Sequence, residues 1–403
     1  MSKSFCIMPW ITLHPVPSGQ VNPCCIWPRD MEGFGNINEQ SLNEIATGPA
    51  MNELRRKFLN DEYIKGCDLC FTKEAAFKED ELNPAVSPRL HNNNRFNHLI
   101  KEALDNTNPD GSLKAPFKMK TLNIRWSNLC NCACRSCGPT DSSLWGQQVG
   151  IKNPVRSLND FNTNLFEQLK EHLPYLEKIN FVGGEPLLID EHWLMLEELI
   201  KVGNIDLEIH TNSNMNKITY KNKSIIDYIK KFKNYRLFAS IDAMGERAEV
   251  YRFGTNWAAV EENMRAIKNA GCELRINSTV GAVNILHIMD VQKWVFEHEL
   301  VKPENFYIYH LENPQHLNLR IFPPAFKTQV EEKVLEHIEW CKDNDVPIIF
   351  WENAIKLLHY EFNEKSLKHF IVTQNHLNKV QGKNLFDAFP ELVPLVKHAL
   401  TIK

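Results

Sequence analysis

The sequence predicts an α/β protein whose central parallel sheet curls into a barrel or part of one. Between residues 120 and 312, six short β-rich runs alternate with amphipathic helical runs. The chain has 403 residues, 43% of them hydrophobic, which is enough for a large core without disulfides. Because right-handed crossovers curl such repeats in one sense, a barrel is favoured over the alternative, a doubly wound open sheet.

Each expected strand is a short run rich in β-branched and aromatic residues. The strands are expected at 120–127, 178–182, 206–211, 235–242, 273–280 and 305–311. Between them, apolar residues recur at spacings of three and four, which is typical of amphipathic helices. Examples are Leu165/Leu169/Leu173, Leu196/Leu199/Ile200 and Val260/Met264/Ile267, the last of these ended by Gly271.

Residues 119–312 form the expected barrel core, and the segments before and after it differ from it in composition. Residues 1–75 are rich in proline and cysteine, with a helical period only over 42–59, which predicts one helix there. Residues 76–118 are polar, with an NNN run and an NPDG turn, and are interpreted as a linker with one short helix. Residues 313–403 begin with several prolines, which separate them from the barrel, and are expected to form a mainly helical tail. Its clearest helix has Val330, Val334 and Ile338 on one face.

Charge and hydropathy exclude several classes of protein. The 46 Lys and Arg residues are balanced by 50 Asp and Glu residues, so nucleic acid is not expected as a partner. No run reaches the roughly 18 apolar residues of a membrane span. The short apolar run near the N-terminus is interrupted by Pro9 and lacks a cleavage site for export. A cytoplasmic location is therefore expected, where cysteines more often bind metals than form disulfides.

The eleven cysteines are concentrated in the first third of the chain. Nine of them lie at or before Cys137, and only Cys272 and Cys341 lie beyond it. Such clustering indicates sets of metal ligands, because structural thiols in a core would be scattered.

One set follows the first expected strand directly. Cys130, Cys134 and Cys137 have the spacing C-x3-C-x2-C, and barrels of this kind build their sites at the carboxyl ends of strands. Three thiolates leave the fourth metal position of a four-iron cluster open for a cofactor or substrate. The run alone is also compatible with zinc. Cys132, inside the run, is interpreted as a spare thiol.

The sequence here resembles the radical S-adenosylmethionine (SAM) superfamily, whose signature is this cysteine spacing after the first strand of a partial (β/α)6 barrel. Gly183-Gly184-Glu185-Pro186, at the end of the second expected strand, is similar to the GGEP motif of that family. The resemblance implies that this motif contacts the methionine amino group of SAM. Glycines allow close approach of the backbone, and a carboxylate can pair with an ammonium.

Five further residues resemble cofactor contacts of the same family. Ser240-Ile-Asp242 ends the fourth expected strand, and Arg252 follows it, as in an SxD…R pattern. The resemblance implies that Ser240 and Arg252 bind the ribose or the methionine carboxylate of SAM, and that Asp242 belongs to the same cofactor-binding site. Asn212 and Asn277 lie where family members often contact the cofactor. From the residues alone, Asp242 is equally suited to cap a helix, and Arg252 to lie on a solvated face.

The second set of cysteines is Cys6, Cys24, Cys67 and Cys70. Together with the segment PSGQVNPCC it resembles the twitch or SPASM auxiliary domain of radical enzymes, which implies one auxiliary 4Fe-4S cluster. Cys24 is preferred over Cys25 because it fits the G-x4-C spacing. Family members usually carry this domain after the barrel, whereas here it comes first. A four-cysteine zinc ribbon is the alternative.

The resemblance also implies a reaction. Reductive cleavage of SAM gives a 5′-deoxyadenosyl radical that abstracts hydrogen from a peptide, a protein or a small metabolite, and the auxiliary cluster transfers electrons. The expected partner is an electron donor such as flavodoxin or ferredoxin. No catalytic side chain is assigned, since His210, Tyr309 and His310 at the strand ends are better explained by packing. The alternative is a non-catalytic interaction protein that binds zinc.

Overall fold

The structure is a computed structural model that describes residues 3–28, 30–78, 82–84, 86–160 and 164–401. Its central sheet has six parallel strands in the order β13-β12-β10-β7-β6-β4, which is the order of the chain. The strands are β4 (Thr121–Ile124), β6 (Lys178–Phe181), β7 (Glu208–Ser213), β10 (Asn234–Ser240), β12 (Leu274–Val280) and β13 (Phe306–His310). The six expected strands are therefore confirmed. The doubly wound alternative is wrong, because that topology reverses its strand order at a switch point.

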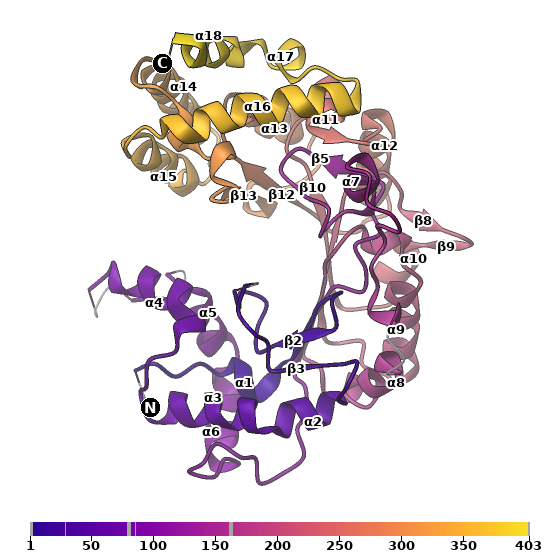
Figure 1. The fold of residues 1–403 in the computed structure, drawn as a ribbon. Coiled ribbons are helices and arrows are strands. Elements are labelled where there is room, and N and C mark those ends of the chain that lie inside the picture. The colour runs from indigo at the N-terminus through magenta and orange to yellow at the C-terminus, as the bar shows by residue number, and fades with distance from the viewer. Residues whose placement is uncertain (1–2, 29, 79–81, 85, 161–163, 402–403) are drawn as a thin grey trace.

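The two faces of this sheet differ in what covers them. Leu122, Ile179, Ile209, Leu237 and Ile276 are fully buried on one face, which we call the outer face. Helices pack along it: α8 (Leu165–Lys170), α9 (Asp190–Lys201), α10 (Ile225–Ile229), α12 (Trp257–Asn269) and α13 (Ile285–Glu297), as Figure 1 shows for the first four. The apolar core lies between these helices and the sheet. The alternate residues of each strand form the opposite, inner face.

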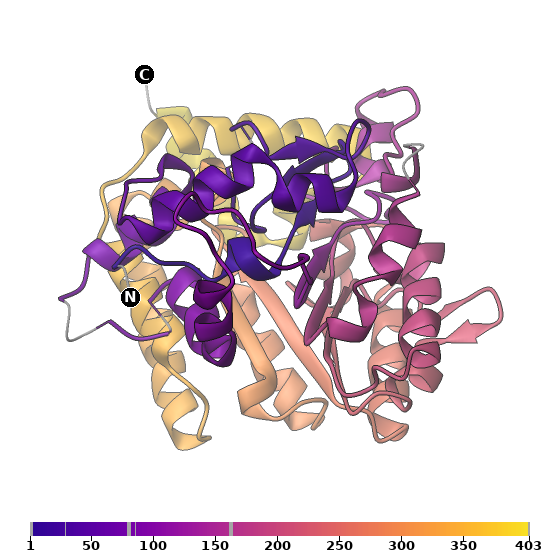
Figure 2. The same ribbon diagram turned by 90° about the horizontal axis from the view of Figure 1, so that it is seen from below.

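The N-terminal segment docks on β4, at one edge of the sheet (Figure 2). It contains α1 (Met8–Ile11), β1 (His14–Pro15), β2 (Gln20–Asn22), β3 (Gly35–Asn36), α2 (Leu42–Thr47), α3 (Pro49–Leu59) and α4 (Asp68–Ala75). The Lys120 amide donates to the Ile11 carbonyl at 2.8 Å, and Nδ1 of His14 lies 2.7 Å from the Asn123 carbonyl. The segment thus contacts the backbone of β4 and of the residue before it.

Two expectations for the segments before the barrel need correction. The single helix expected over 42–59 is two helices, because Gly48 is extended and Pro49 starts a new helix that it could not continue. The polar segment 76–118 contains two helices rather than one, α5 (Pro88–Arg95) and α6 (Asn97–Asp105).

The C-terminal segment is helical, as expected. It consists of α14 (Pro324–Asp343), α15 (Ile349–Leu358), α16 (Glu364–Gln381), α17 (Leu385–Ala388) and α18 (Val393–Thr401). Val330, Val334 and Ile338 are buried together on α14. On α15, Phe350 stacks on His310 with a centroid distance of 4.2 Å, which covers the sheet at β13. No described helix is long and apolar enough to cross a membrane.

Candidate functional site

The loop after β4 carries Cys130, Cys134 and Cys137 into one cavity of about 400 Å³ at the carboxyl end of the sheet. Segments far apart in the chain line this cavity together. The other predicted site residues on its wall are Gly183, Gly184, Glu185, Asn212, Ser240 and Arg252. Pro186, Asp242 and Asn277 are not among the lining residues. Their contact with a cofactor stays a prediction, as do the roles of the residues in the wall.

A short antiparallel pair of strands places Arg252 beside the cysteines. In β5 (Ala133–Cys134) and β11 (Arg252–Phe253), Cys134 is directly opposite Arg252. The pKa of the Cys134 thiol is lowered, chiefly because Cys132 donates to it and also because Arg252 is near, against the opposing effect of burial. A lowered pKa favours the thiolate, which is the form that binds metal.

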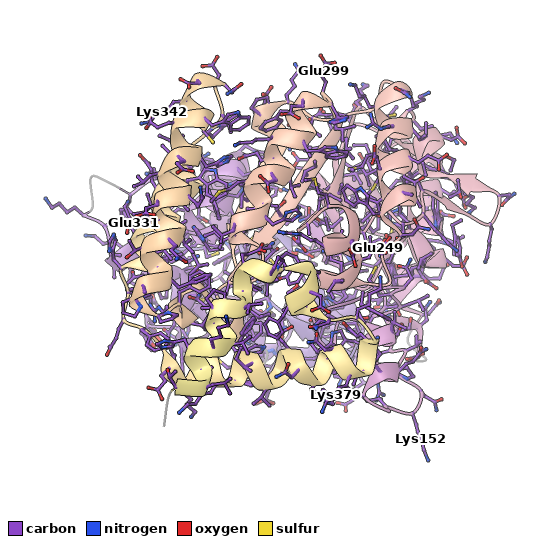
Figure 3. The ribbon with its side chains drawn as sticks, turned by 90° about the horizontal axis from the view of Figure 1, so that it is seen from above. Lys152, Glu249, Glu299, Glu331, Lys342 and Lys379 are labelled. Atoms are coloured by element: carbon purple, nitrogen blue, oxygen red, sulfur yellow. The ribbon has the colours of Figure 1, made fainter. Side chains whose placement is uncertain are left out.

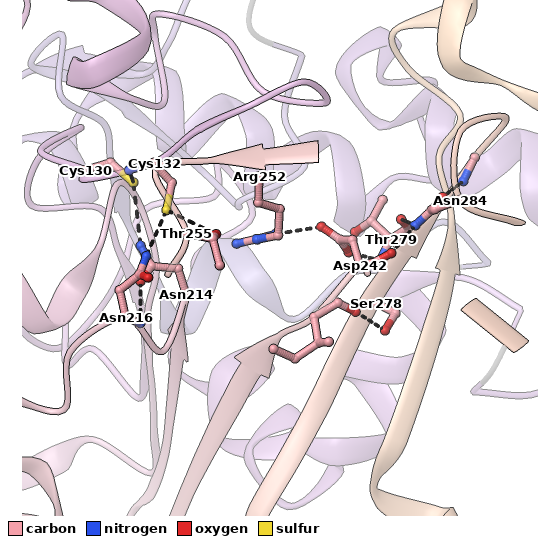
Figure 4. A network of polar contacts seen from close by, with 12 residues as sticks. Cys130, Cys132, Asn214, Asn216, Asp242, Arg252, Thr255, Ser278, Thr279 and Asn284 are labelled. Carbon is pink, nitrogen blue, oxygen red and sulfur yellow. Dashed lines mark hydrogen bonds and ion pairs between the residues drawn. The ribbon is translucent and has the colours of Figure 1, made fainter. Parts of the chain in front are cut away.

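Asp242 holds Arg252 in place (Figure 4). Its Oδ2 accepts from Nη1 of Arg252 at 2.6 Å, and its Oδ1 accepts from the Thr279 amide at 2.8 Å. Because both carboxylate oxygens are occupied and the residue is buried, Asp242 orients the guanidinium. This arrangement differs from the helix cap that the residue type alone allowed.

The GGEP turn presses against the cysteine loop. Gly183 has a φ of 116°, and a Cβ on Gly184 would lie 2.1 Å from the Leu129 carbonyl oxygen. The Glu185 amide donates to that same carbonyl at 2.7 Å. The glycines therefore allow close approach of the cysteine loop, in addition to any approach of a ligand.

Glu185 is a buried carboxyl group in the wall of the cavity. Its Oε2 accepts from the Asn214 amide at 2.7 Å and its Oε1 from the Leu187 amide at 3.2 Å. Burial raises the pKa of Glu185 to about 7, although these hydrogen bonds oppose the shift. An ammonium group arriving at this carboxyl would stabilise its ionised form.

We expect Gly184→Ala to destabilise the protein, because the new methyl meets a backbone carbonyl that cannot rotate away. Overpacking of this kind costs about 1–3 kcal/mol of the free energy of unfolding. Urea unfolding followed by circular dichroism measures the change. Gly138→Ala is the matched control, since nothing lies within 4 Å of its Cβ position. Equal stability of the two variants would contradict the packing argument.

Asparagine side chains after β7 reach the sulfur atoms of the loop (Figure 4). Nδ2 of Asn214 donates to Asn131 at 2.7 Å and lies 4.0 Å from Sγ of Cys130, and Nδ2 of Asn216 donates to Sγ of Cys132 at 3.1 Å. The sequence analysis missed both residues. Their signal was the alternation of asparagine at 212, 214 and 216, directly after a strand.

The remaining predicted residues lie as follows. Cys132, interpreted as a spare thiol, is buried against Asn216 and next to the cysteines of the motif. Asn277 donates to Oδ1 of Asn212 at 2.8 Å, so these two predicted cofactor contacts support one another on the inner face.

The second set of thiols also converges. Burial, followed by the influence of other thiols of the set, raises the pKa of Cys6 to about 12 and that of Cys67 to about 12. The thiols of Cys24 and Cys70 belong to the same group of interacting thiols, and their pKa values are raised as well. Cys25 is exposed and interacts with Asn123 and Lys178 instead. Cys24, rather than Cys25, therefore faces the other thiols.

Comparison with protein families decides the identity. A model described as "Radical SAM superfamily" matches residues 124–295, and the SPASM model, described as "Iron-sulfur cluster-binding domain", matches residues 6–71. The chain contains a radical SAM domain. It carries a SPASM-like domain before its barrel, and its cofactors are a 4Fe-4S cluster, SAM and auxiliary iron–sulfur.

Solved structures show only distant similarity to this radical SAM protein. Streptococcus suis SuiB bound to S-adenosylmethionine is 16% identical with a TM-score of 0.37, over 66% of this chain and 52% of SuiB. The anSMEcpe structure with AdoMet and a peptide is 16% identical with a TM-score of 0.40, over 56% of this chain and 62% of anSMEcpe. The chain thus spans about half to three fifths of these proteins. No curated protein matches it.

The thiols of the radical SAM protein supply the donor chemistry of iron–sulfur clusters, because such clusters are held by cysteine thiolates. Three thiols in one cavity fit the SAM-binding cluster, and four thiols in the SPASM-like domain fit a closed one.

Arg89 is a functional candidate in the SPASM-like site that the sequence analysis missed. It is buried, ion-paired with Glu74, and its positive charge acts on Cys6, Cys67 and Cys70. Its Nη1 donates to the Phe5 carbonyl at 2.7 Å, next to Cys6. Arg89 lies on α5, in the segment interpreted as a linker. A buried cation beside thiolates favours their ionised form.

The C-terminal helices hold the cysteine loop of the radical SAM core. Buried Arg135, inside the motif, donates from Nη1 to Gln374 of α16 at 3.1 Å and from Nη2 to the Lys383 carbonyl at 2.8 Å. Gln381 donates to the Ala133 carbonyl at 3.0 Å. Lys383 pairs with Glu249, which Figure 3 labels beside these helices. The helical segment therefore supports the cluster loop.

We expect Arg252→Gln to weaken SAM binding by about 10- to 100-fold, because a hydrogen bond to a charged group contributes about 1.5–3 kcal/mol. Asp242→Asn should weaken it less, since the guanidinium remains but is held loosely. Calorimetric titration of SAM into anaerobically reconstituted protein measures both. Arg265→Gln, a partly exposed arginine paired with Glu261, is the control. Unchanged affinity in Arg252→Gln would show that Arg252 does not contact SAM.

Proposed function

We propose that the protein is a radical SAM enzyme that oxidises a peptide, a protein side chain or a small metabolite held at the inner face of its barrel. The observation that carries this proposal is the position of the SPASM-like domain. Cys25, adjacent to Cys24, interacts with Asn123 and Lys178 of the inner face. An electron acceptor is therefore expected next to the bound substrate, which favours oxidation over a redox-neutral rearrangement.

Two groups of residues in the cavity would have different roles, one in holding the cluster and one in holding SAM. Cys130, Cys134 and Cys137 would hold the SAM-binding cluster and leave one iron open, while Glu185 and Arg252 would hold the amino acid part of SAM. When bound, the cluster supplies the electron that splits SAM into methionine and a 5′-deoxyadenosyl radical. The cysteine loop and the GGEP turn line the cavity at this position.

The proposed reaction balances as a two-electron oxidation. The substrate loses one hydrogen atom to the 5′-deoxyadenosyl radical, which becomes 5′-deoxyadenosine. The substrate radical has a second electron and a proton still to lose. Cys6, Cys24, Cys67 and Cys70 would hold an auxiliary iron–sulfur cluster, which would supply the acceptor for that electron, and the proton goes to solvent. The electron that cleaves SAM comes from an external reductant, for which flavodoxin or ferredoxin is the proposed partner.

Product analysis tests this proposal. The reduced enzyme is incubated with SAM and a library of peptides and metabolites, and we expect 5′-deoxyadenosine together with a product lighter by two hydrogen atoms or cross-linked. The same incubation in heavy water distinguishes the alternatives. A product of unchanged composition that gains one carbon-bound deuterium would show a redox-neutral reaction and overturn the proposal.

A further inference from the structure

The inner face of the sheet is polar, unlike the interior of a closed barrel. Closed (β/α) barrels fill this space with branched apolar side chains. Here Lys178, Glu208, His210, Arg236 and Arg275 occupy inner-face positions, as strand alternation and the parallel register establish. Arg236 keeps 33% of its side-chain surface exposed. The inner face therefore carries charged groups where a closed barrel has a packed apolar core.

Positive charge exceeds negative charge on this surface. The Glu208 carboxylate receives Nη2 of Arg95 at 2.7 Å, Nζ of Lys178 at 3.1 Å and Nη1 of Arg236 at 3.1 Å. Nε2 of His210 also lies 2.6 Å from it. One carboxylate thus faces three permanent cations. Arg275 adds no excess, because Glu273 pairs with it at 2.7 Å.

One buried donor beside this surface has no partner. Nε of Arg95 makes no hydrogen bond within the described parts of the chain. Burial also lowers the pKa of Lys178, which reports that its charge is incompletely compensated. Unpaired buried donors and uncompensated cations are costly, so a ligand that supplies negative oxygen atoms would be stabilised here.

We propose that the inner face binds a substrate that carries an oxyanion, a carboxylate or a phosphate, at Arg236 and Lys178. The inference rests on the proposed function, whose substrate class it names. Arginine presents a planar pair of donors that matches both kinds of oxyanion. The side chain of Phe238 lies between this charge and the SAM cavity, and it contacts His210 at a centroid distance of 5.0 Å and Tyr307 at 5.9 Å.

The strand register also sets the length of the substrate. Arg236 precedes Ser240, which lines the SAM cavity, by four residues on β10. At about 3.3 Å per residue, the two positions are about 13 Å apart along the strand. The reacting hydrogen and the oxyanion are therefore separated by an extended, partly apolar stretch. A molecule the size of a free glycine would not span that distance.

Anion binding by the full-length, reconstituted enzyme tests the proposal. Saturating SAM is present throughout, so that Arg252 is occupied. Inorganic phosphate and glutarate are titrated at constant ionic strength, and thermal unfolding is followed. We expect a saturable rise in the unfolding temperature with at least one of them, and none with neutral glutaramide. The stronger of the two effects distinguishes phosphate from carboxylate as the preferred group.

Variants locate the effect. Arg236→Gln should weaken the apparent affinity at least tenfold, and Arg236→Lys should retain part of it. Lys233→Gln, three residues earlier and 67% exposed, should leave it unchanged. No saturable effect of either anion, or an equal effect in Arg236→Gln, would overturn the proposal and leave Glu208 as a group that only ties α5 to the sheet. Cleavage of SAM by the wild-type enzyme without substrate tests the proposed function separately.

Discussion

Replacement of Cys130, Cys134 and Cys137 by alanine is expected to abolish the formation of 5′-deoxyadenosine from SAM by the reduced enzyme. The three thiols share one cavity with Arg252 and the GGEP turn, so no other site should take over their role. Iron should fall from about eight to about four atoms per chain, because only the closed set of thiols remains. Liquid chromatography of the reaction and iron and sulfide analysis measure the two effects.

Cys272→Ala serves as the control for this loss. Cys272 lies at the opposite, amino end of β12 and should leave both iron content and product unchanged. Undiminished 5′-deoxyadenosine in the triple variant would refute the ligand assignment. Zinc in both sites of the anaerobically purified wild-type protein, without acid-labile sulfide, would refute iron–sulfur chemistry altogether.

The second large effect is a difference in iron content between variants of the adjacent residues Cys24 and Cys25. We expect Cys24→Ala to lose about four iron atoms per chain, because removal of one of four thiolates opens a closed site. Cys25→Ala should keep all of them, since its thiol interacts with Asn123 and Lys178. Iron and sulfide analysis with electron paramagnetic resonance of the reduced protein compares the two variants. The reverse pattern would exchange the assignment of the ligand.

Local patterns explain why the barrel was predictable. The six strands were found because β-rich runs and helical periods depend on residues a few positions apart. The C-x3-C-x2-C and GGEP motifs are local for the same reason, so their resemblance to the radical SAM superfamily was visible in the sequence. In contrast, the break at Gly48 depends on a single Gly-Pro step, which interrupts a helical period that otherwise continues.

The partners of the site were not predictable in the same way. Asn214 and Asn216 contact sulfur atoms more than eighty positions earlier in the chain, and Arg89 reaches Cys6 from the segment interpreted as a linker. Single polar residues of these types usually face solvent. Only the folded chain distinguishes those that face a buried thiol.

By itself, the sequence predicted the strands and helices of the barrel, because these rest on local periodicity, and its resemblance to the radical SAM superfamily implied the two sets of cysteine ligands. Only the tertiary structure decided where the SPASM-like set lies, since docking on β4 depends on contacts between Ile11, His14 and a strand more than a hundred positions away. It also decided the charge of the inner face. A period of two says which residues alternate, but parallel register and curvature decide which cations meet at Glu208.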